Sequence, residues 1–356
     1  EQAALLPAAV SVRDLLRWKG AISRIAEGQD IRGIGILARR NRLRIDVADT
    51  TAIERLRVAA DALGIPAHAI EFASPIVQPL QSVQTGTFTP MIGGINYGIG
   101  QITPLPHCTI WGFARVEDDE WYGLTNSHCL TPKGTVTGVN IAQPFTKTSP
   151  PWDGQEWIDP AWNVAQRHPD CINGVARCRY SDAAAFFVSN WRTRERGRIA
   201  RTTGAVQWGY GPLQSVAPAF HVTGIIDFPL DGEVVNKVGA RTGWTRGPVE
   251  GSCYDVGYIS GGFFYRVLCN VRVVASAYYG DSGSPVFFDT GPTTARITGI
   301  LWGGEFCRGP GFDQNRADVC PPNFTWNSTF PSQAFYMNPW WAVRQELGFP
   351  DSAVLP

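Results

Sequence analysis

The sequence lacks several features that would place it in large classes of protein. No stretch of about 18 uncharged apolar residues occurs, so no segment is predicted to cross a bilayer as a helix. Net charge is also missing, because 31 Lys and Arg balance 31 Asp and Glu, so we expect neither nucleic acid nor membrane as a partner. With 44% hydrophobic residues, the chain can bury a large core. Its 38 glycines and 26 prolines, scattered without a period, predict a mainly β fold.

Cysteine is absent from the first 107 residues, and all eight cysteines lie beyond them. Their even number predicts disulfides, although eight cysteines allow about 105 pairings. Neighbours paired in order close four short loops, and on that basis we expect Cys108–Cys129, Cys171–Cys178, Cys253–Cys269 and Cys307–Cys320. A zinc site is disfavoured because no C-x2-C spacing occurs, so we expect no metal.

Disulfides imply an oxidising compartment, and we therefore expect a secreted protein. The chain begins Glu1-Gln2 without Met, which suggests that a signal peptide has been removed. Asn323 and Asn327 each open a glycosylation sequon, which is usable only in a eukaryotic secretory pathway.

The first 73 residues predict a small α+β domain. Ser11 and Thr51 each stand three residues before an acid, a pattern that starts helices, so we expect helices near 12–27 and 52–63. Between them, 31–37 and 43–47 alternate as a hairpin would, and 68–72 resembles a third strand. No charged Lys, Arg, Asp or Glu occurs from Phe72 to Ala114. We assign 1–73 to an N-terminal domain, 74–90 to a linker and 91–356 to a second, all-β domain.

Three stretches of the second domain supply what acyl transfer needs. Thr125-Asn-Ser-His128-Cys129 ends a strand-like run in a histidine, Asp182 opens an apolar run, and Gly280-Asp-Ser282-Gly-Ser-Pro forms a small-residue turn. Serine is a weak nucleophile at neutral pH and needs a base such as histidine, which in turn needs a carboxylate to hold its tautomer. Gly280 would let its own N–H and that of Ser282 point at a developing oxyanion.

These motifs resemble the His, Asp and Ser motifs of chymotrypsin-like serine proteases, in that family's chain order. Further similar segments include Cys108 placed 21 residues before Cys129, Val238–Val249, Gly299–Gly304 and Met91–Gly94. The T-N-S-H-C motif is similar to bacterial or fungal branches rather than to the T-A-A-H-C of animal enzymes. The resemblance implies two antiparallel six-stranded β-barrels, a Ser282–His128–Asp182 triad, an oxyanion hole at Gly280 and Ser282, and no cofactor.

The resemblance also implies where substrate binds. Ser276, six residues before Ser282, would lie at the base of the primary pocket, and Leu301, Trp302 and Gly303 would line its strand. Ser276 is not acidic, so we expect large apolar or aromatic residues before the cleaved bond rather than Arg or Lys. The acidic side chain of Glu305 is the feature of the sequence that argues most strongly against this apolar preference.

The N-terminal domain is similar to the pro-domains of streptogrisin-like bacterial proteases. We expect it to act in cis, either as a pro-domain that occupies the active site until the 74–91 segment is cut or as a permanent regulator. An esterase is disfavoured because a G-x-S-x-G elbow is incomplete at Ser282 and its chain order would be reversed. A catalytically silent binding protein is the alternative from another class. Protein or peptide substrates are the expected partners.

Overall fold

The computed structural model describes residues 10–25, 31–47, 51–73, 76–79, 87–99, 107–116, 120–130, 132–144, 146–147, 149–162, 169–190, 192–213, 215–306 and 332–356. Residues 10–73 form what we call the N-terminal module. Its helices and strands are α1 (Val12–Ile25), β1 (Ile31–Leu37), η1 (Ala38–Arg40), β2 (Arg42–Val47), α2 (Thr51–Ala62), η2 (Ala67–Ala69) and β3 (Ile70–Ala73). The helices and strands predicted from the sequence are confirmed here.

The module has a core of its own. β1 pairs antiparallel with β2, and β3 pairs parallel with β2. The helices cover this sheet with buried Leu15, Ile22 and Leu56, which join Ile34 and Leu43 of the strands in one apolar cluster. The predicted start of α1 is present, because the Ser11 hydroxyl accepts a hydrogen bond from the Asp14 N–H at 3.0 Å.

The first half of the larger domain is a seven-stranded sheet in the order β7-β6-β10-β11-β13-β9-β8. Its strands are β6 (Asn96–Ile99), β7 (His107–Thr109), β8 (Gly112–Arg115), β9 (Trp121–Asn126), β10 (Asn140–Ala142), β11 (Gly154–Ile158) and β13 (Ala183–Val188). All of its pairings are antiparallel. A short turn, η4 (Ser127–Cys129), follows β9.

The second half belongs to a larger sheet that runs β12-β18-β21-β20-β19-β16-β17-β1-β2-β3. Its strands outside the module are β4 (Ile76–Pro79), β5 (Met91–Gly93), β12 (Arg177–Arg179), β14 (Arg194–Ile199), β15 (Phe220–Ile225), β16 (Val234–Gly239), β17 (Gly243–Ser260), β18 (Phe263–Val273), β19 (Pro285–Gly291), β20 (Thr294–Phe306) and β21 (Ala334–Pro339). The remaining helices are α3 (Pro169–Ile172), α4 (Trp340–Leu347) and α5 (Asp351–Val354). Two β-rich halves with few helices, behind a small α+β module, confirm the predicted fold class.

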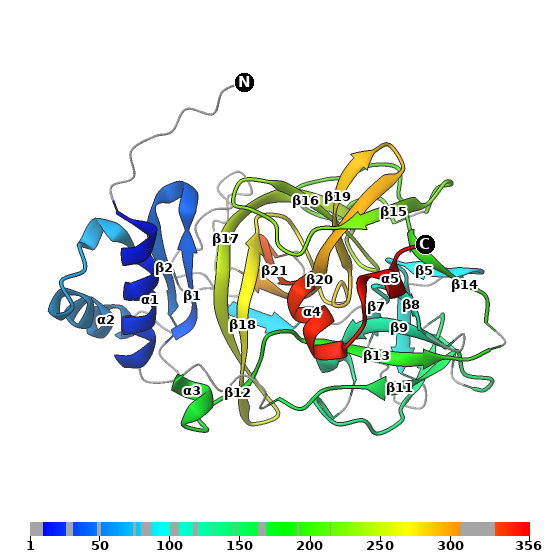
Figure 1. The fold of residues 1–356 in the computed structure, drawn as a ribbon, viewed down its shortest axis with the longest axis horizontal. Helices are drawn as coiled ribbons and strands as arrows, with labels where there is room; N and C mark the ends of the chain where they lie inside the picture. The colour runs from blue at the N-terminus through cyan, green and yellow to red at the C-terminus, as the bar shows by residue number, and fades with distance from the viewer. Residues whose placement is uncertain are drawn as a thin grey trace.

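The N-terminal module extends the second sheet rather than standing apart from it. β1 pairs antiparallel with β17, placing Ile34 opposite Asp255. Figure 1 shows the module at one end of the molecule, beside β17 and β18. β4, which lies in the predicted linker, pairs antiparallel with the end of β20, so that Pro79 lies opposite Gly303.

A group of buried and half-buried charges joins the module to the larger domain. This interface ion cluster comprises Arg40, Arg44, Asp46 and Glu71 of the module with Glu250, Arg272 and Glu305 of β17, β18 and β20. Glu305 lies at its centre, with Arg44 Nη2 at 2.5 Å and Arg272 Nε at 2.7 Å. Burial alone would raise the pKa of Glu305, but the two guanidinium groups lower it to about 2. At Asp46 the effect of burial is larger than the opposing effect of the Arg44 charge, so the pKa of the Asp46 carboxyl is raised.

Candidate active site

Antiparallel pairing of β9 with β13 brings His128 and Asp182 together. Asn126 at the end of β9 lies opposite Ala183 at the start of β13, so the residues just beyond each strand meet at one edge. The Asp182 carbonyl accepts hydrogen bonds from Ser127 N at 2.7 Å and Asn126 Nδ2 at 3.0 Å. One backbone hydrogen bond and the side-chain amide of Asn126 therefore hold this junction together.

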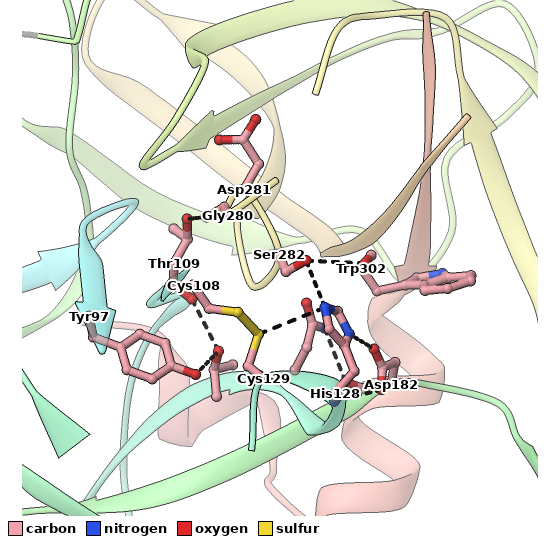
Figure 2. Close-up of a disulfide and its surroundings, with 12 residues drawn as sticks. Tyr97, Cys108, Thr109, His128, Cys129, Asp182, Gly280, Asp281, Ser282 and Trp302 are labelled. Atoms are coloured by element: carbon pink, nitrogen blue, oxygen red, sulfur yellow. Dashed lines mark hydrogen bonds and ion pairs between the residues drawn. A yellow bond between two sulfur atoms is a disulfide. The ribbon is translucent and has the colours of Figure 1, made fainter. Parts of the chain in front are cut away.

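His128 connects the other two predicted catalytic residues. Its Nδ1 contacts Asp182 Oδ2, its Nε2 lies 2.8 Å from Ser282 Oγ, and its backbone N–H reaches Asp182 Oδ1 at 3.2 Å. Figure 2 shows the imidazole lying between Ser282 and Asp182. A carboxylate can only accept, so the neutral imidazole carries its proton on Nδ1 and turns the lone pair of Nε2 toward the serine hydroxyl.

The turn that carries Ser282 is held against the first half of the domain by Thr109. The Thr109 N–H donates to the Ser282 carbonyl at 2.7 Å. The Thr109 hydroxyl donates to the Gly280 carbonyl, also at 2.7 Å (Figure 2). Gly283 has φ +89°, and a β-carbon there would lie 2.0 Å from the Thr109 carbonyl oxygen. Gly280 has φ +100°, a conformation that favours glycine.

Three of the expected disulfides are present, and Cys307 and Cys320 lie outside the described residues. The bonds are Cys108–Cys129, Cys171–Cys178 and Cys253–Cys269. Cys108–Cys129 ties β7 to the turn that bears His128 (Figure 2). Potential metal-ligand atoms of these two cysteines and His128 lie within 4.8 Å of one another, but the sulfurs are bonded to each other and offer no thiolate to a metal.

Asp281 carries a buried carboxylate next to Ser282. It accepts hydrogen bonds from the backbone of Tyr278, Arg241 and Thr242, at 2.9 to 3.0 Å. Lys237 Nζ lies 3.1 Å from it, and both side chains are fully buried. Burial lowers the pKa of Lys237, and the charge of Asp281 acts against that effect. These contacts fix the Asp281 carboxylate and with it the turn that carries Ser282.

Sequence reasoning missed Lys237. A signal was present, because Val234-Val-Asn-Lys237-Val-Gly239 sets a single lysine inside an otherwise strand-like apolar run. Long cations are rarely fully buried without a partner. Such a lysine therefore indicates a buried carboxylate opposite it.

The predicted substrate-binding residues lie near the nucleophile to different degrees. The Trp302 carbonyl lies 3.3 Å from Ser282 Oγ, and the Leu301 carbonyl accepts from Gly283 N at 2.8 Å. Ser276 is buried, and its hydroxyl accepts from Gly209 N at 2.9 Å. Gly303 pairs with Pro79 of β4. Glu305 is committed to Arg44 and Arg272 in the interface ion cluster.

Two other buried acids of the larger domain are paired with arginines. Asp153 pairs with Arg192 at 2.9 Å and Asp159 with Arg179 at 3.1 Å. Burial raises the pKa of Asp159 to about 6 although Arg179 opposes the shift. Neither acid pairs with His128 in the contacts of the described chain.

No protein-family model and no curated protein matches this chain. Solved structures with a similar arrangement include bacterial serine proteases. Thermobifida fusca protease A is 18% identical with a TM-score of 0.43, and the match covers 72% of this chain and 95% of that one. Cellulomonas bogoriensis chymotrypsin is 16% identical with a TM-score of 0.42, covering 74% and 100%. Nocardiopsis protease is 16% identical with a TM-score of 0.43, covering 72% and 96%. These values are too low to show a shared function.

Replacing Lys237→Met should destabilise the protein by about 3–5 kcal/mol, because it leaves the Asp281 carboxylate buried without a cation. Urea unfolding measures the change. The double variant Lys237→Met with Asp281→Asn should recover much of the loss, since the uncompensated charge is gone. Equal stability of the wild type and Lys237→Met would show that the ion pair does not hold the turn.

Proposed function

We propose that this protein is a serine endopeptidase that hydrolyses peptide bonds through an acyl-enzyme intermediate. One observation carries the proposal, the continuous contact from Asp182 through His128 to Ser282, with Nε2 and Oγ 2.8 Å apart. The same three side chains are buried together, which excludes water from the proton path.

In the proposed reaction, Ser282 Oγ attacks the substrate carbonyl while its proton passes to His128 Nε2. The oxyanion that forms is stabilised by the N–H groups of Gly280 and Ser282. His128 then gives the proton to the departing amine, leaving an acyl-Ser282 ester. Water, deprotonated by the same nitrogen, attacks this ester and releases the acid and free Ser282. Asp182 keeps the imidazole in one tautomer and stabilises its cationic form.

A fluorophosphonate probe should label the wild-type protein at one residue and should not label Ser282→Ala. The probe reacts only with a serine whose proton is removed by a neighbouring base. Ser260→Ala, on the β17–β18 hairpin, serves as the matched control and should label as the wild type does. Gel fluorescence followed by peptide mapping locates the label.

Equal labelling of Ser282→Ala and wild type would overturn the proposal. The wild type should be sampled over time, as an intact chain and as any shortened product. Absence of label from both forms would favour the silent binding protein.

We propose a preference for large apolar or aromatic side chains before the cleaved bond. Ser276 offers no carboxylate to a substrate cation, and Glu305 is already paired with two guanidinium groups. A buried substrate Arg would therefore lack a counter-ion, which is costly.

Peptides that differ only in the residue before the cleaved bond should show kcat/KM at least about 10-fold higher for Phe or Leu than for Arg or Glu. Hydrolysis of a fluorogenic panel measures this ratio. A higher value for Arg would contradict the assignment of Ser276 to the base of the pocket.

We further propose that the N-terminal module holds the enzyme latent, as a zymogen, until the chain is cut between residues 74 and 91. Two observations support this. β4 pairs with residues 303–306 of β20, the edge along which a peptide substrate would extend the sheet. The Ser282 side chain is fully buried in the intact chain. The three disulfides of the described residues support secretion of this enzyme, because disulfides persist in oxidising environments outside the cytosol.

Arg44→Met should make the intact chain react faster with the fluorophosphonate probe. The substitution leaves Glu305 with one guanidinium fewer and Asp46 without its partner, which weakens docking of the module. Arg17→Met is the matched control, because Arg17 pairs with Asp14 on the exposed side of α1, where an ion pair contributes about 0–1 kcal/mol. Labelling rates are compared after circular dichroism shows that both variants are folded. Equal rates would count against latency through this interface.

A further inference from the structure

Two buried asparagines, Asn270 and Asn338, lie close to the proposed catalytic residues. Neither belongs to the sequence motifs from which those catalytic residues were predicted. Asn270 lies on β18 and Asn338 on β21, and both are fully buried. Asn270 uses all four of its hydrogen-bonding positions. Its Oδ1 accepts from Trp302 Nε1 at 2.8 Å and Asn338 Nδ2 at 2.7 Å, and its Nδ2 donates to the carbonyls of Tyr254 at 3.0 Å and Val267 at 2.7 Å. Both amides therefore have one orientation that satisfies every partner.

Asn338 in turn holds the main chain of Asp182. Its Oδ1 accepts a hydrogen bond from the Asp182 N–H at 2.8 Å. The Asp182 carbonyl is held from the opposite side by Asn126 and Ser127. The main chain of Asp182 is thus fixed at both its donor and its acceptor, and its carboxylate meets His128 from a backbone that cannot shift alone.

Trp302 is tied to the same pair. Its indole N–H ends on Asn270, while its carbonyl lies 3.3 Å from Ser282 Oγ. One amide pair therefore connects the strand beside the nucleophile with the residue that orients the base. No charged group takes part, so the connection does not depend on ionisation.

We propose that Asn338 and Asn270 are positioning residues that hold Asp182 and Trp302 as one unit. This inference rests on the proposed endopeptidase function for its kinetic consequences. Removing the Asn338 amide would leave the Asp182 N–H buried and unpaired, and the aspartate would move to find a new acceptor. Removing the Asn270 amide would free the Trp302 indole as well, so the binding strand would loosen together with the triad.

The chain offers a matched control. Asn236 is also fully buried and also accepts from an indole, Trp244 Nε1 at 2.9 Å, but it donates to Asp289 and contacts no proposed catalytic residue. Asn236→Leu therefore also removes a buried amide that accepts one hydrogen bond and donates another, and should cost a comparable amount of stability. A role in stability alone would make Asn338→Leu and Asn236→Leu alike.

The experiment measures hydrolysis and unfolding for Asn338→Leu, Asn338→Asp, Asn270→Leu and Asn236→Leu, in the form in which the wild type cuts peptides. Asn338→Leu should lower kcat about 100-fold with little change in KM, since displacement of a catalytic group by about 1 Å costs that much. Asn270→Leu should lower kcat and also raise KM. Asn236→Leu should keep the wild-type kcat when corrected for its folded fraction.

Asn338→Asp keeps the proposal testable if the leucine variant does not fold. The introduced carboxyl has the shape of the amide, and in its neutral form it can accept from Asp182 N–H and donate to Asn270. Burial beside Asp182 raises its pKa, so the neutral form persists at low pH and is lost as pH rises. Its kcat relative to wild type should therefore fall with increasing pH, a profile that Asn236→Leu should not show.

A second readout works without turnover. In the intact wild-type chain, the Nδ1 proton shared by His128 and Asp182 should give a downfield proton resonance that disappears in His128→Ala. Asn338→Leu should shift or broaden it, and Asn236→Leu should leave it in place. An unchanged resonance together with kcat within about twofold of Asn236→Leu would overturn the proposal. If the wild type hydrolyses no peptide but Asn338→Leu still shifts or broadens the resonance and Asn236→Leu does not, only the endopeptidase function is overturned.

Discussion

The buried carboxylate of Asp281 is the constraint from which the arrangement around Ser282 follows. A charge without water needs both donors and an opposite charge, so the turn at 240–243 supplies N–H groups and Lys237 supplies the cation. Meeting that need closes the turn at 278–284 and sets Gly280 at positive φ. Ser282 therefore lies on a backbone whose shape is fixed by contacts within the folded chain.

Contacts between segments far apart in the chain hold Ser282, His128 and Asp182 in place relative to one another. Thr109 donates hydrogen bonds to the carbonyls of Ser282 and Gly280. The disulfide of the neighbouring Cys108 joins the same strand to the turn that bears His128. From the far side, Asn338 holds Asp182. Strand β7 therefore holds both Ser282 and His128, whereas β21 holds Asp182, and alignment to within hydrogen-bonding distance depends on the packing of two sheets rather than on one loop.

The sequence carried local information well and distant pairing poorly. Helices α1 and α2 and the hairpin of β1 and β2 were predictable, because caps and alternation act within a few residues. His128, Asp182 and Ser282 were recognisable through motifs, whereas their distances were not. Asn338 and Asn270 carry no local signal, since an isolated asparagine gives no indication of its partner. Arg44 and Glu305 are 261 residues apart, and no periodicity of the chain could relate them.

Every cysteine lies beyond residue 107, so no disulfide can fasten the N-terminal module to the rest of the protein. If the connecting segment were cut as proposed, the module would be retained by β-pairing, by charge and by the apolar cluster that Leu37 shares with Tyr254 and Val256. Separation of the two parts would then be insensitive to reducing agents and sensitive to ionic conditions. Departure would leave Glu250, Glu305 and Arg272 with one negative charge in excess. Water that enters there solvates these groups, and a returning module must strip it away again, so separation proceeds more readily than reassembly.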